Sequence, residues 1–200
     1  LANTSDWKLI LSDPIESKQW EAGVKFTPEW LDGYINLAYF DLKQKNALSQ
    51  TMVGGTLATA VTRRRKRAGL RLKLTKSLST DLTYTYMSAT YGDQNTRADY
   101  MPHNIATAWV NYDFTSLGVT GLTLGTGVRY RGTSINTATK DKVDDVLLWD
   151  AAASWKIDNH WKLNGTISNI TDKVFITGAY GNIAYYGEGR LMKATMTYSW

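Results

Sequence analysis

The sequence contains no cysteine, and it contains only three prolines among its 200 residues. Without cysteine the chain can form no disulfide, no thiolate nucleophile and no cysteine-ligated zinc site. No run of about 18 or more apolar residues occurs, which excludes a transmembrane helix. Yet 43% of the residues are hydrophobic, while the mean hydropathy is only −0.33. The apolar residues are therefore dispersed along the chain.

Their dispersion is regular, and it is clearest in the last ten residues. From Leu191 onward, every second residue is apolar or aromatic and the residues between them are polar. The apolar set is Met192, Ala194, Met196, Tyr198 and Trp200. A period of two residues predicts a β-strand with one apolar and one polar face. A terminal Trp is typical of a strand that ends at a membrane interface.

The same alternation recurs along the chain and predicts about nine strands. In residues 34–43 the sequence does not decide which face is apolar, because both alternating sets are: Ile35, Leu37 and Tyr39, and Ala38, Phe40 and Leu42. The prolines, Pro14, Pro28 and Pro102, fall in connections or at strand starts, where a hydrogen-bonded ladder tolerates them. No segment shows a convincing helical period. We predict strands near 17–27, 34–43, 67–74, 82–86, 106–114, 122–131, 147–156, 161–168 and 191–200.

The connections alternate in length. Short turns are predicted near 28–32, 76–80, 115–121 and 158–160, and longer polar loops near 45–60, 90–102, 134–145 and 172–186. Bacterial outer-membrane barrels have short periplasmic turns and long extracellular loops. Aromatic residues gather near the short turns, as in an interfacial girdle: Phe26, Trp30, Phe114, Trp155, Trp161, Tyr198 and Trp200. The predicted fold is all-β, an antiparallel transmembrane β-barrel segment of about nine strands in the bacterial outer membrane.

The alternation also assigns side chains to the two faces of this sheet. We expect Asp150, Lys193 and Arg129 on the concave face. The outward set comprises Trp149, Ala151, Ala153, Trp155, Met192, Ala194 and Met196. An error of one residue would exchange the two sets.

The strand number points to a part of a larger barrel. Bacterial single-chain barrels have even strand numbers, whereas about nine strands would place residues 1–14 on the extracellular side. We therefore expect residues 1–200 to be the C-terminal segment of a larger barrel.

Four segments resemble the TonB-dependent ferric-siderophore receptors of bacterial outer membranes, in the right order and spacing. Residues 16–25 (ESKQWEAGVK) resemble that family's ESKQYEVGVK strand, and residues 148–153 (LWDAAA) its LWDAAA strand. Residues 168–173 (SNITDK) resemble its xNLxDKxY strand end, and residues 186–190 (YGEGR) with 198–200 (YSW) its closing motif. The resemblance covers residues 16–200.

The resemblance implies a receptor for a ferric siderophore in a plugged barrel of about 22 strands. It also implies that the plug, the TonB box and more than half of the barrel strands lie outside this chain. Contact with the TonB complex would be made by those parts, so the segment is expected to be inactive alone. Iron would arrive as a ferric-siderophore complex, so no cofactor is expected. Two alternatives remain: a self-contained small porin or channel, and a barrel enzyme with an inward acid–base cluster.

The candidate ligand-binding residues lie at the predicted rim and lumen: Arg129, Arg131, Tyr180, Tyr185 and Tyr186. The tyrosines could instead pack on each other.

A second candidate is the basic run 63–67, with Arg63, Arg65 and Arg67, in a chain of net charge +5. Arginine suits an anionic siderophore or the phosphates of lipopolysaccharide, a partner expected together with the outer-membrane lipids. A solvated strand end is the simpler interpretation.

No catalytic or metal site is predicted. His103 and His160 lie far apart and lack metal-ligand partners at useful spacing. No Ser/His/Asp arrangement can be recognised, so an enzyme is not expected. Nothing around the basic run indicates a nucleic-acid-binding module.

Overall fold

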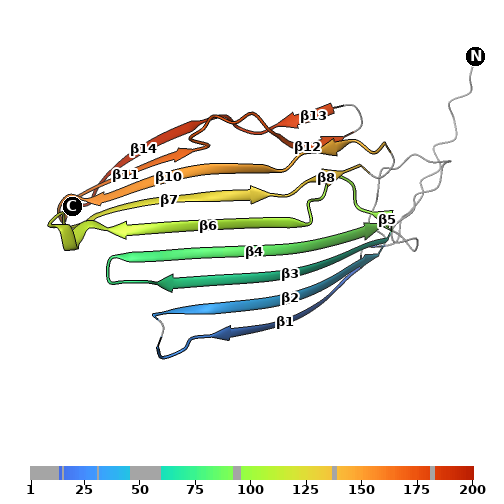
Figure 1. Ribbon diagram of the computed structural model, residues 1–200, viewed down its shortest axis with the longest axis horizontal. Coiled ribbons are helices and arrows are strands. Elements are labelled where there is room, and N and C mark those ends of the chain that lie inside the picture. The colour runs from blue at the N-terminus through green and yellow to red at the C-terminus, as the bar shows by residue number, and fades with distance from the viewer. Residues whose placement is uncertain are drawn as a thin grey trace, which may run out of the picture.

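The computed structural model describes residues 14, 16–30, 32–45, 60–91, 96–136, 139–180 and 183–200. Nine long strands form one antiparallel sheet in which each is paired with its neighbours along the chain (Figure 1). They are β1 (Glu16–Phe26), β2 (Gly33–Lys45), β3 (Ala60–Lys73), β4 (Leu78–Tyr91), β6 (Asn104–Asp113), β7 (Leu122–Arg131), β10 (Val146–Lys156), β11 (Trp161–Ser168) and β14 (Leu191–Tyr198). The predicted strand set is confirmed.

The connections are short at one end of the sheet and long at the other, as predicted (Figure 1). We call these the short-turn end and the long-connection end. The long connections carry structure of their own: β5 (Thr96–Arg97), the hairpin β8 (Ser134–Ile135) with β9 (Lys142–Val143), and the hairpin β12 (Ile176–Tyr180) with β13 (Ile183–Tyr186). A 3-10 helix, η1 (Phe114–Leu117), occupies one short turn.

Two strands are longer than the sequence predicted. β3 begins at Ala60 and β4 runs from Leu78 to Tyr91. The basic run 63–67 therefore lies within a paired strand, where Arg65 is opposite Met87 and Phe40. The run lies near the beginning of β3, and whether its side chains are solvated falls outside the described residues. The alternation of apolar and polar residues cannot be recognised within a run of like charges. The backbone of these residues nevertheless forms the same strand pairs as the rest of β3.

The turn between β10 and β11 is fixed by Asp158. Its Oδ1 atom accepts the backbone N–H groups of Trp161 and His160, both at 2.7 Å. These two bonds favour the ionised carboxylate and lower the pKa of Asp158 below its ordinary value of 3.8. His160 and Trp161 in turn contact the ring of Tyr198, with centroid distances of 5.7 and 4.8 Å. Part of the predicted aromatic girdle thus forms one cluster at the short-turn end.

The pairing register confirms the predicted faces. Leu148 is opposite Arg129 and lies two residues before Asp150, while Thr166 is opposite both Ala152 and Lys193. Directly opposite residues share a face of a sheet. One face therefore carries the Arg129, Asp150 and Lys193 set. The other carries Trp149, Ala151, Ala153, Trp155, Met192, Ala194 and Met196.

The register also settles the face of β2. Leu37 is opposite Ala68 of β3, which is in turn opposite Tyr84 of β4, so the three residues share a face. The side chains of Leu37 and Tyr84 are both exposed. Leu37 and Tyr39 thus belong to the set of Trp149, whereas Phe40 lies on the face of Arg129. The sequence alone could not decide this, because both faces of β2 carry apolar residues.

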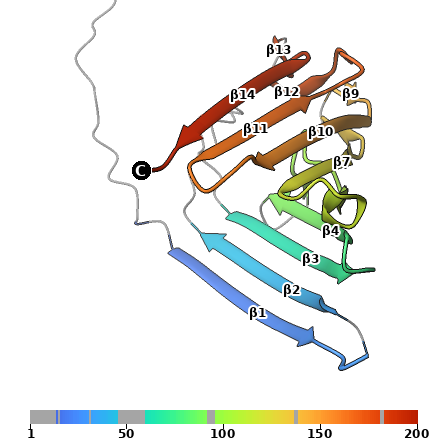
Figure 2. The ribbon, with the colours of Figure 1, turned by 90° about the vertical axis from the view of Figure 1, so that its left-hand side faces the viewer.

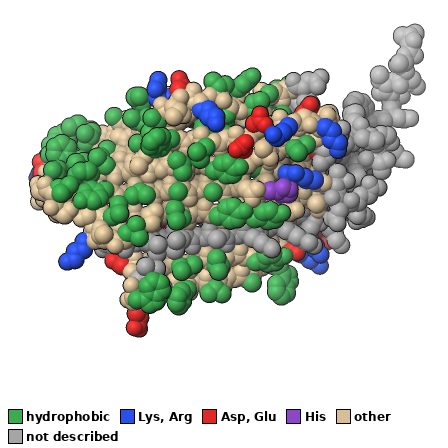
Figure 3. Space-filling model, in the orientation of Figure 1, with side chains coloured by type: hydrophobic (Ala, Val, Ile, Leu, Met, Phe, Trp, Pro, Cys, Tyr) green, Lys and Arg blue, Asp and Glu red, His purple; other side chains and the backbone are tan. Residues whose placement is uncertain are grey.

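The sheet curls into an open trough (Figure 2), with β1 and β14 as its two unpaired edges. We call the face of Arg129 and Asp150 the concave face, and the other the convex face. Burial follows this division: Leu148 is 4% exposed on the concave face and Trp149 is 50% exposed on the convex face. Space-filling atoms show hydrophobic side chains spread across the sheet, and several charged side chains near the long-connection end (Figure 3).

None of the described residues forms a helix long and apolar enough to cross a membrane.

Candidate functional site on the concave face

A cavity of about 680 Å³ lies on the concave face towards the long-connection end. It is formed by β6, β7, β10, β11 and the chain that follows β11. Its lining includes Trp109, Arg129, Arg131, Asp150, Asn169 and Glu188. Two of the predicted ligand-binding residues, Arg129 and Arg131, therefore line one cavity.

Arg129 is fixed by Asp150. Its Nη2 donates to Asp150 Oδ1 at 3.0 Å, and its Nε donates to Oδ2, which makes a bidentate pair. The backbone N–H of Asn169 also donates to Asp150 Oδ1, at 2.8 Å. The Asp150 side chain is 12% exposed and that of Arg129 is 51% exposed. The charge of Arg129 is thus compensated by Asp150 within the sheet. Arg129 therefore fixes the position of the Asp150 carboxylate.

Arg131 has no carboxylate at its guanidinium among the described contacts. Nη1 donates to the carbonyl of Thr177 at 2.6 Å and Nη2 to that of Ile176, both at the start of β12. Its buried Nε has no hydrogen-bond partner within the described residues. The two carbonyl dipoles satisfy Nη1 and Nη2 without cancelling the charge of the guanidinium. Within the described part of the chain, Arg131 therefore has no carboxylate at hydrogen-bond distance, although Glu188 lines the same cavity.

The predicted tyrosines lie on the hairpin β12–β13. Tyr185 is 53% exposed and Tyr186 is 69% exposed, while the side chain of Tyr180 lies outside the described residues. The structure joins Arg131 to the base of this hairpin but not to the tyrosine rings. The side chains of Arg63, Arg65 and Arg67 also lie outside the described residues, and their backbone belongs to β3.

Trp109 covers part of the floor of the cavity. The ring lies over Gly125 and Gly127 of the neighbouring strand: a Cβ added at Gly125 would be 2.8 Å from Trp109 Nε1. At Gly127 an added Cβ would overlap both the Trp109 ring and the carbonyl of Ala108. Trp109 Nε1 donates to Asn111 Oδ1 at 2.7 Å. The two glycines are therefore required so that an indole can lie flat on the sheet.

Gly127→Val should displace the Trp109 ring and lower the free energy of unfolding by about 1–2 kcal/mol, because overpacking forces the ring and backbone to move. Urea unfolding of the complete receptor in detergent, followed by fluorescence, measures this change. Gly178→Val is the matched control, because nothing lies within 4 Å of a Cβ at that position. Equal stability of the Gly127→Val variant and the native protein would contradict the packing described.

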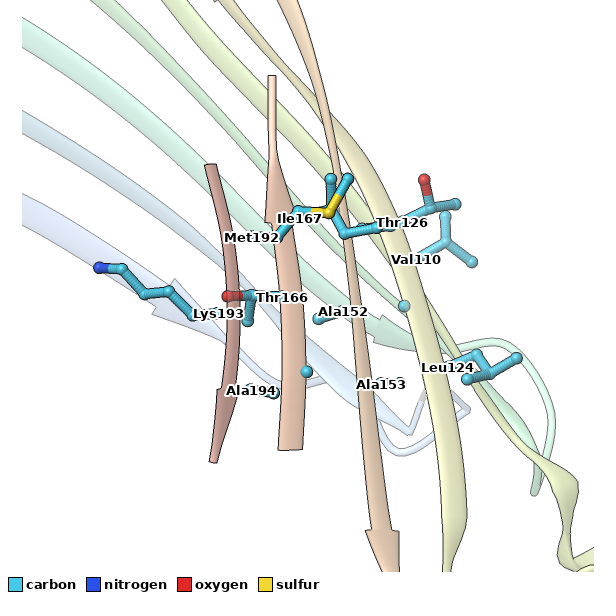
Figure 4. Close-up of a pocket in the computed structure, with 13 residues that line it drawn as sticks. Val110, Leu124, Thr126, Ala152, Ala153, Thr166, Ile167, Met192, Lys193 and Ala194 are labelled. Atoms are coloured by element: carbon cyan, nitrogen blue, oxygen red, sulfur yellow. The ribbon is translucent and has the colours of Figure 1, made fainter. Parts of the chain in front are cut away.

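A second depression lies on the convex face and is apolar (Figure 4). It measures about 650 Å³ and is floored by small residues, including Ala151, Ala153, Gly165 and Ala194. Larger side chains border it, among them Leu124, Ile167 and Met192, and Lys193 points away from it. It contains no arrangement of polar groups that would orient a ligand, so it is not the candidate site.

Within the described ranges, no group of three or more His, Cys, Asp or Glu residues is placed to hold a metal ion. The clearest electrostatic feature of the loops is the pair Lys142–Asp144, with Nζ and Oδ1 3.0 Å apart. The hydrogen bond to Asp144 raises the pKa of Lys142 above 10.5. Both side chains are largely exposed, so this pair contributes little to stability.

Sequence reasoning did not identify Trp109, Asp150 or Asn169 as parts of one site. Asp150 and Asn169 each lie within a segment that resembles the receptor family, LWDAAA and SNITDK. Asp150 and Asn169 are 19 positions apart in the sequence and meet only through the pairing of β10 with β11. The resemblance of their segments to the family was therefore the only feature of the sequence that could have indicated a shared site.

Comparisons with known proteins agree with this architecture. Residues 8–170 match the model of the family described as TonB dependent receptor-like, beta-barrel. The chain is 28% identical to the ferrioxamine B receptor of Salmonella typhimurium over 94% of the chain and 28% of that receptor. It is also 28% identical to the ferrichrome outer membrane transporter/phage receptor of Escherichia coli, over 92% of the chain and 26% of that protein.

Solved structures show the same fold. The ferric yersiniabactin uptake receptor of Yersinia pestis superposes with a TM-score of 0.74 at 16% identity, over 93% of this chain and 30% of that one. The pyoverdine outer membrane receptor of Pseudomonas aeruginosa superposes with a TM-score of 0.73 at 21% identity, over 94% of this chain and 30% of that one. The chain thus spans less than a third of the relatives it matches. Because the family model covers most of its length, the chain belongs to the TonB-dependent receptor β-barrel family.

Proposed function

We propose that this chain is the C-terminal barrel wall of a TonB-dependent receptor that takes up a ferric siderophore across the outer membrane. The observation that carries the proposal is the alignment of 94% of the chain with a receptor named for ferrioxamine B. In this proposal the plug, the remaining barrel strands and the contact with the TonB complex belong to parts of the receptor outside residues 1–200. The chain itself would supply wall, loops and part of the ligand surface.

The geometry supports a ligand with an anionic or oxygen-rich surface. Arg131, whose guanidinium donates to carbonyl groups, lines the cavity on the concave face, and the exposed Tyr185 and Tyr186 stand on the hairpin that Arg131 holds. A siderophore supplies its own iron ligands, so the site needs no metal-binding residues. The named relatives are a receptor and a transporter, which supports a role in transport for this chain.

Lipid contacts belong to the convex face in this proposal. Its exposed Leu147, Trp149 and Met192 would face the acyl chains of the outer membrane. The basic run in β3 remains a candidate for the phosphates of lipopolysaccharide or for an anionic ligand. A self-contained porin is not favoured, because β1 and β14 are unpaired edges in the described sheet.

The proposal is tested by equilibrium binding to the complete purified receptor. Ferrioxamine B, ferrichrome, pyoverdine, enterobactin and yersiniabactin, each loaded with iron, are titrated against its tryptophan fluorescence. We expect saturable binding of at least one of them. Arg131→Ala should weaken that binding about tenfold, a loss of about 1.4 kcal/mol, whereas Lys162→Ala at the short-turn end should leave it unchanged. Failure of all five to bind would contradict the proposed function.

A further inference from the structure

The two ends of the connection between β11 and β14 meet at one buried side chain, that of Asn169. This residue directly follows β11 and is 1% exposed. Its Nδ2 donates to the carbonyl oxygens of Lys173 at 2.9 Å and Glu188 at 3.2 Å, and its Oδ1 accepts the N–H of Lys173 at 2.9 Å. One amide group therefore bridges the outgoing and the returning chain.

Neighbouring bonds complete this junction, which we call the loop clasp (residues 169–175 with 187–190). Asp172 Oδ1 accepts the N–H of Arg190 at 2.7 Å, and Arg190 Nη1 donates to the carbonyl of Ile170 at 3.4 Å. The N–H of Gly187 donates to the carbonyl of Phe175 at 2.8 Å. A Cβ at Gly187 would overlap the Phe175 ring, so the two chains approach as closely as they can.

The loop clasp is attached to the barrel wall. The N–H of Asn169 donates to Asp150, which Arg129 also holds, and the N–H of Ile170 donates to the carbonyl of Trp149 at 2.7 Å. These bonds tie it to β10, beyond the last residue of β10 that pairs with β11. The clasp thus has a fixed position relative to the concave cavity.

The hairpin that the clasp carries is held at a second point. Arg131 donates to the carbonyls of Ile176 and Thr177, where the hairpin leaves the clasp. Tyr186 is paired with Ile176 and Tyr185 with Gly178, so both exposed tyrosines lie at this anchored base. Strand β12 also contacts β9. The clasp and Arg131 therefore fix the part of the hairpin that carries both tyrosines.

We propose that Asn169 is a positioning residue for ligand recognition: through the loop clasp it holds the base of the hairpin β12–β13 beside the concave cavity, so that the exposed Tyr185 and Tyr186 contact the ferric siderophore. This inference rests on the proposed function, because it assigns the clasp to the same ligand. It gives one role to two separated segments, 169–175 and 187–190. The two segments hold the hairpin in position, and the tyrosines on the hairpin make the contact with the ligand.

The backbone of Asn169 defines the best substitution. Its φ of +51° lies in the left-handed region, which Asn and Gly adopt more readily than other residues. Asn169→Gly therefore removes the amide bridge without straining the turn. Asn159→Gly, in the exposed turn at the short-turn end, is the matched control.

The first measurement needs no ligand. Tyr186→Cys is introduced into the complete receptor on a background without other cysteines, and its labelling by a bulky maleimide is timed. Adding Asn169→Gly should raise the labelling rate about twofold or more, because residue 186 lies beside the clasp and gains mobility when the base of the hairpin is released. Adding Asn159→Gly should not. An unchanged rate with Asn169→Gly would overturn the inference, whatever the receptor transports.

The second measurement separates positioning from general damage. Uptake of radiolabelled iron as ferrioxamine B or ferrichrome is measured for Asn169→Gly, for the double variant Tyr185→Ala/Tyr186→Ala, and for all three changes together. We expect KM to rise about tenfold in the first two at unchanged receptor abundance and maximal rate, and to rise no further in the third. Independent, multiplying effects would contradict the inference. Uptake by no variant, the unchanged receptor included, would instead count against the proposed function.

Discussion

Cells that produce these 200 residues alone should take up no ferric siderophore above background. The described sheet has two unpaired edges, β1 and β14, and in lipid each unsatisfied backbone group costs several kcal/mol. The sheet also curls into a trough that is open between these two edges (Figure 2). The chain alone should therefore aggregate or associate through its edges, without forming a stable monomeric barrel.

The comparison is made in cells that lack other siderophore receptors. One strain produces the 200-residue chain, and a second produces the complete receptor. Heat-modifiability on gels and surface labelling report whether each product is folded and exposed. Uptake that depends on the 200-residue chain alone would show that the segment is a functional unit.

Asp150→Ala should lower the free energy of unfolding of the complete receptor by about 2–3 kcal/mol. The substitution leaves the Arg129 guanidinium and the N–H of Asn169 without their acceptor, and an unsatisfied buried group costs about 1–3 kcal/mol. The half-exposed Arg129 can recover part of this loss from water. Urea titration in detergent, followed by tryptophan fluorescence, measures the shift in the midpoint.

Two further variants identify the cause. Asp150→Asn keeps an acceptor for Asn169 but loses the charge, so it should lose less stability than Asp150→Ala. Asp145→Ala, an exposed loop acid, should shift the midpoint little. If Asp150→Ala and Asp145→Ala shift it equally, the ion pair and its link to Asn169 do not stabilise the wall.

Strand faces could be predicted where one face of a strand is apolar. In β14 the alternation is clean, and the register confirms every predicted member of both sets. The alternation did not predict that β3 includes residues 60–66, because the basic run masks the two-residue period. It left β2 undecided, because its faces differ only through pairing with β3 and β4.

The site was less accessible to sequence reasoning. Arg129 and Arg131 could be chosen as inward cations, but not their different partners, a carboxylate and two carbonyls. The hairpins within the long connections carry no apolar alternation of sufficient length to be predicted. Asn169 bridges Lys173 and Glu188 only because the chain returns past its own starting point, and no local pattern specifies that meeting.

The central claim is that this chain belongs to the wall of a siderophore receptor energised by TonB. It is tested most directly by uptake of radiolabelled ferric siderophores through the complete receptor, in cells with and without TonB. We predict saturable uptake of at least one siderophore that disappears when TonB is deleted. Passive, unsaturable entry of small solutes that is indifferent to TonB would contradict the claim and identify a channel.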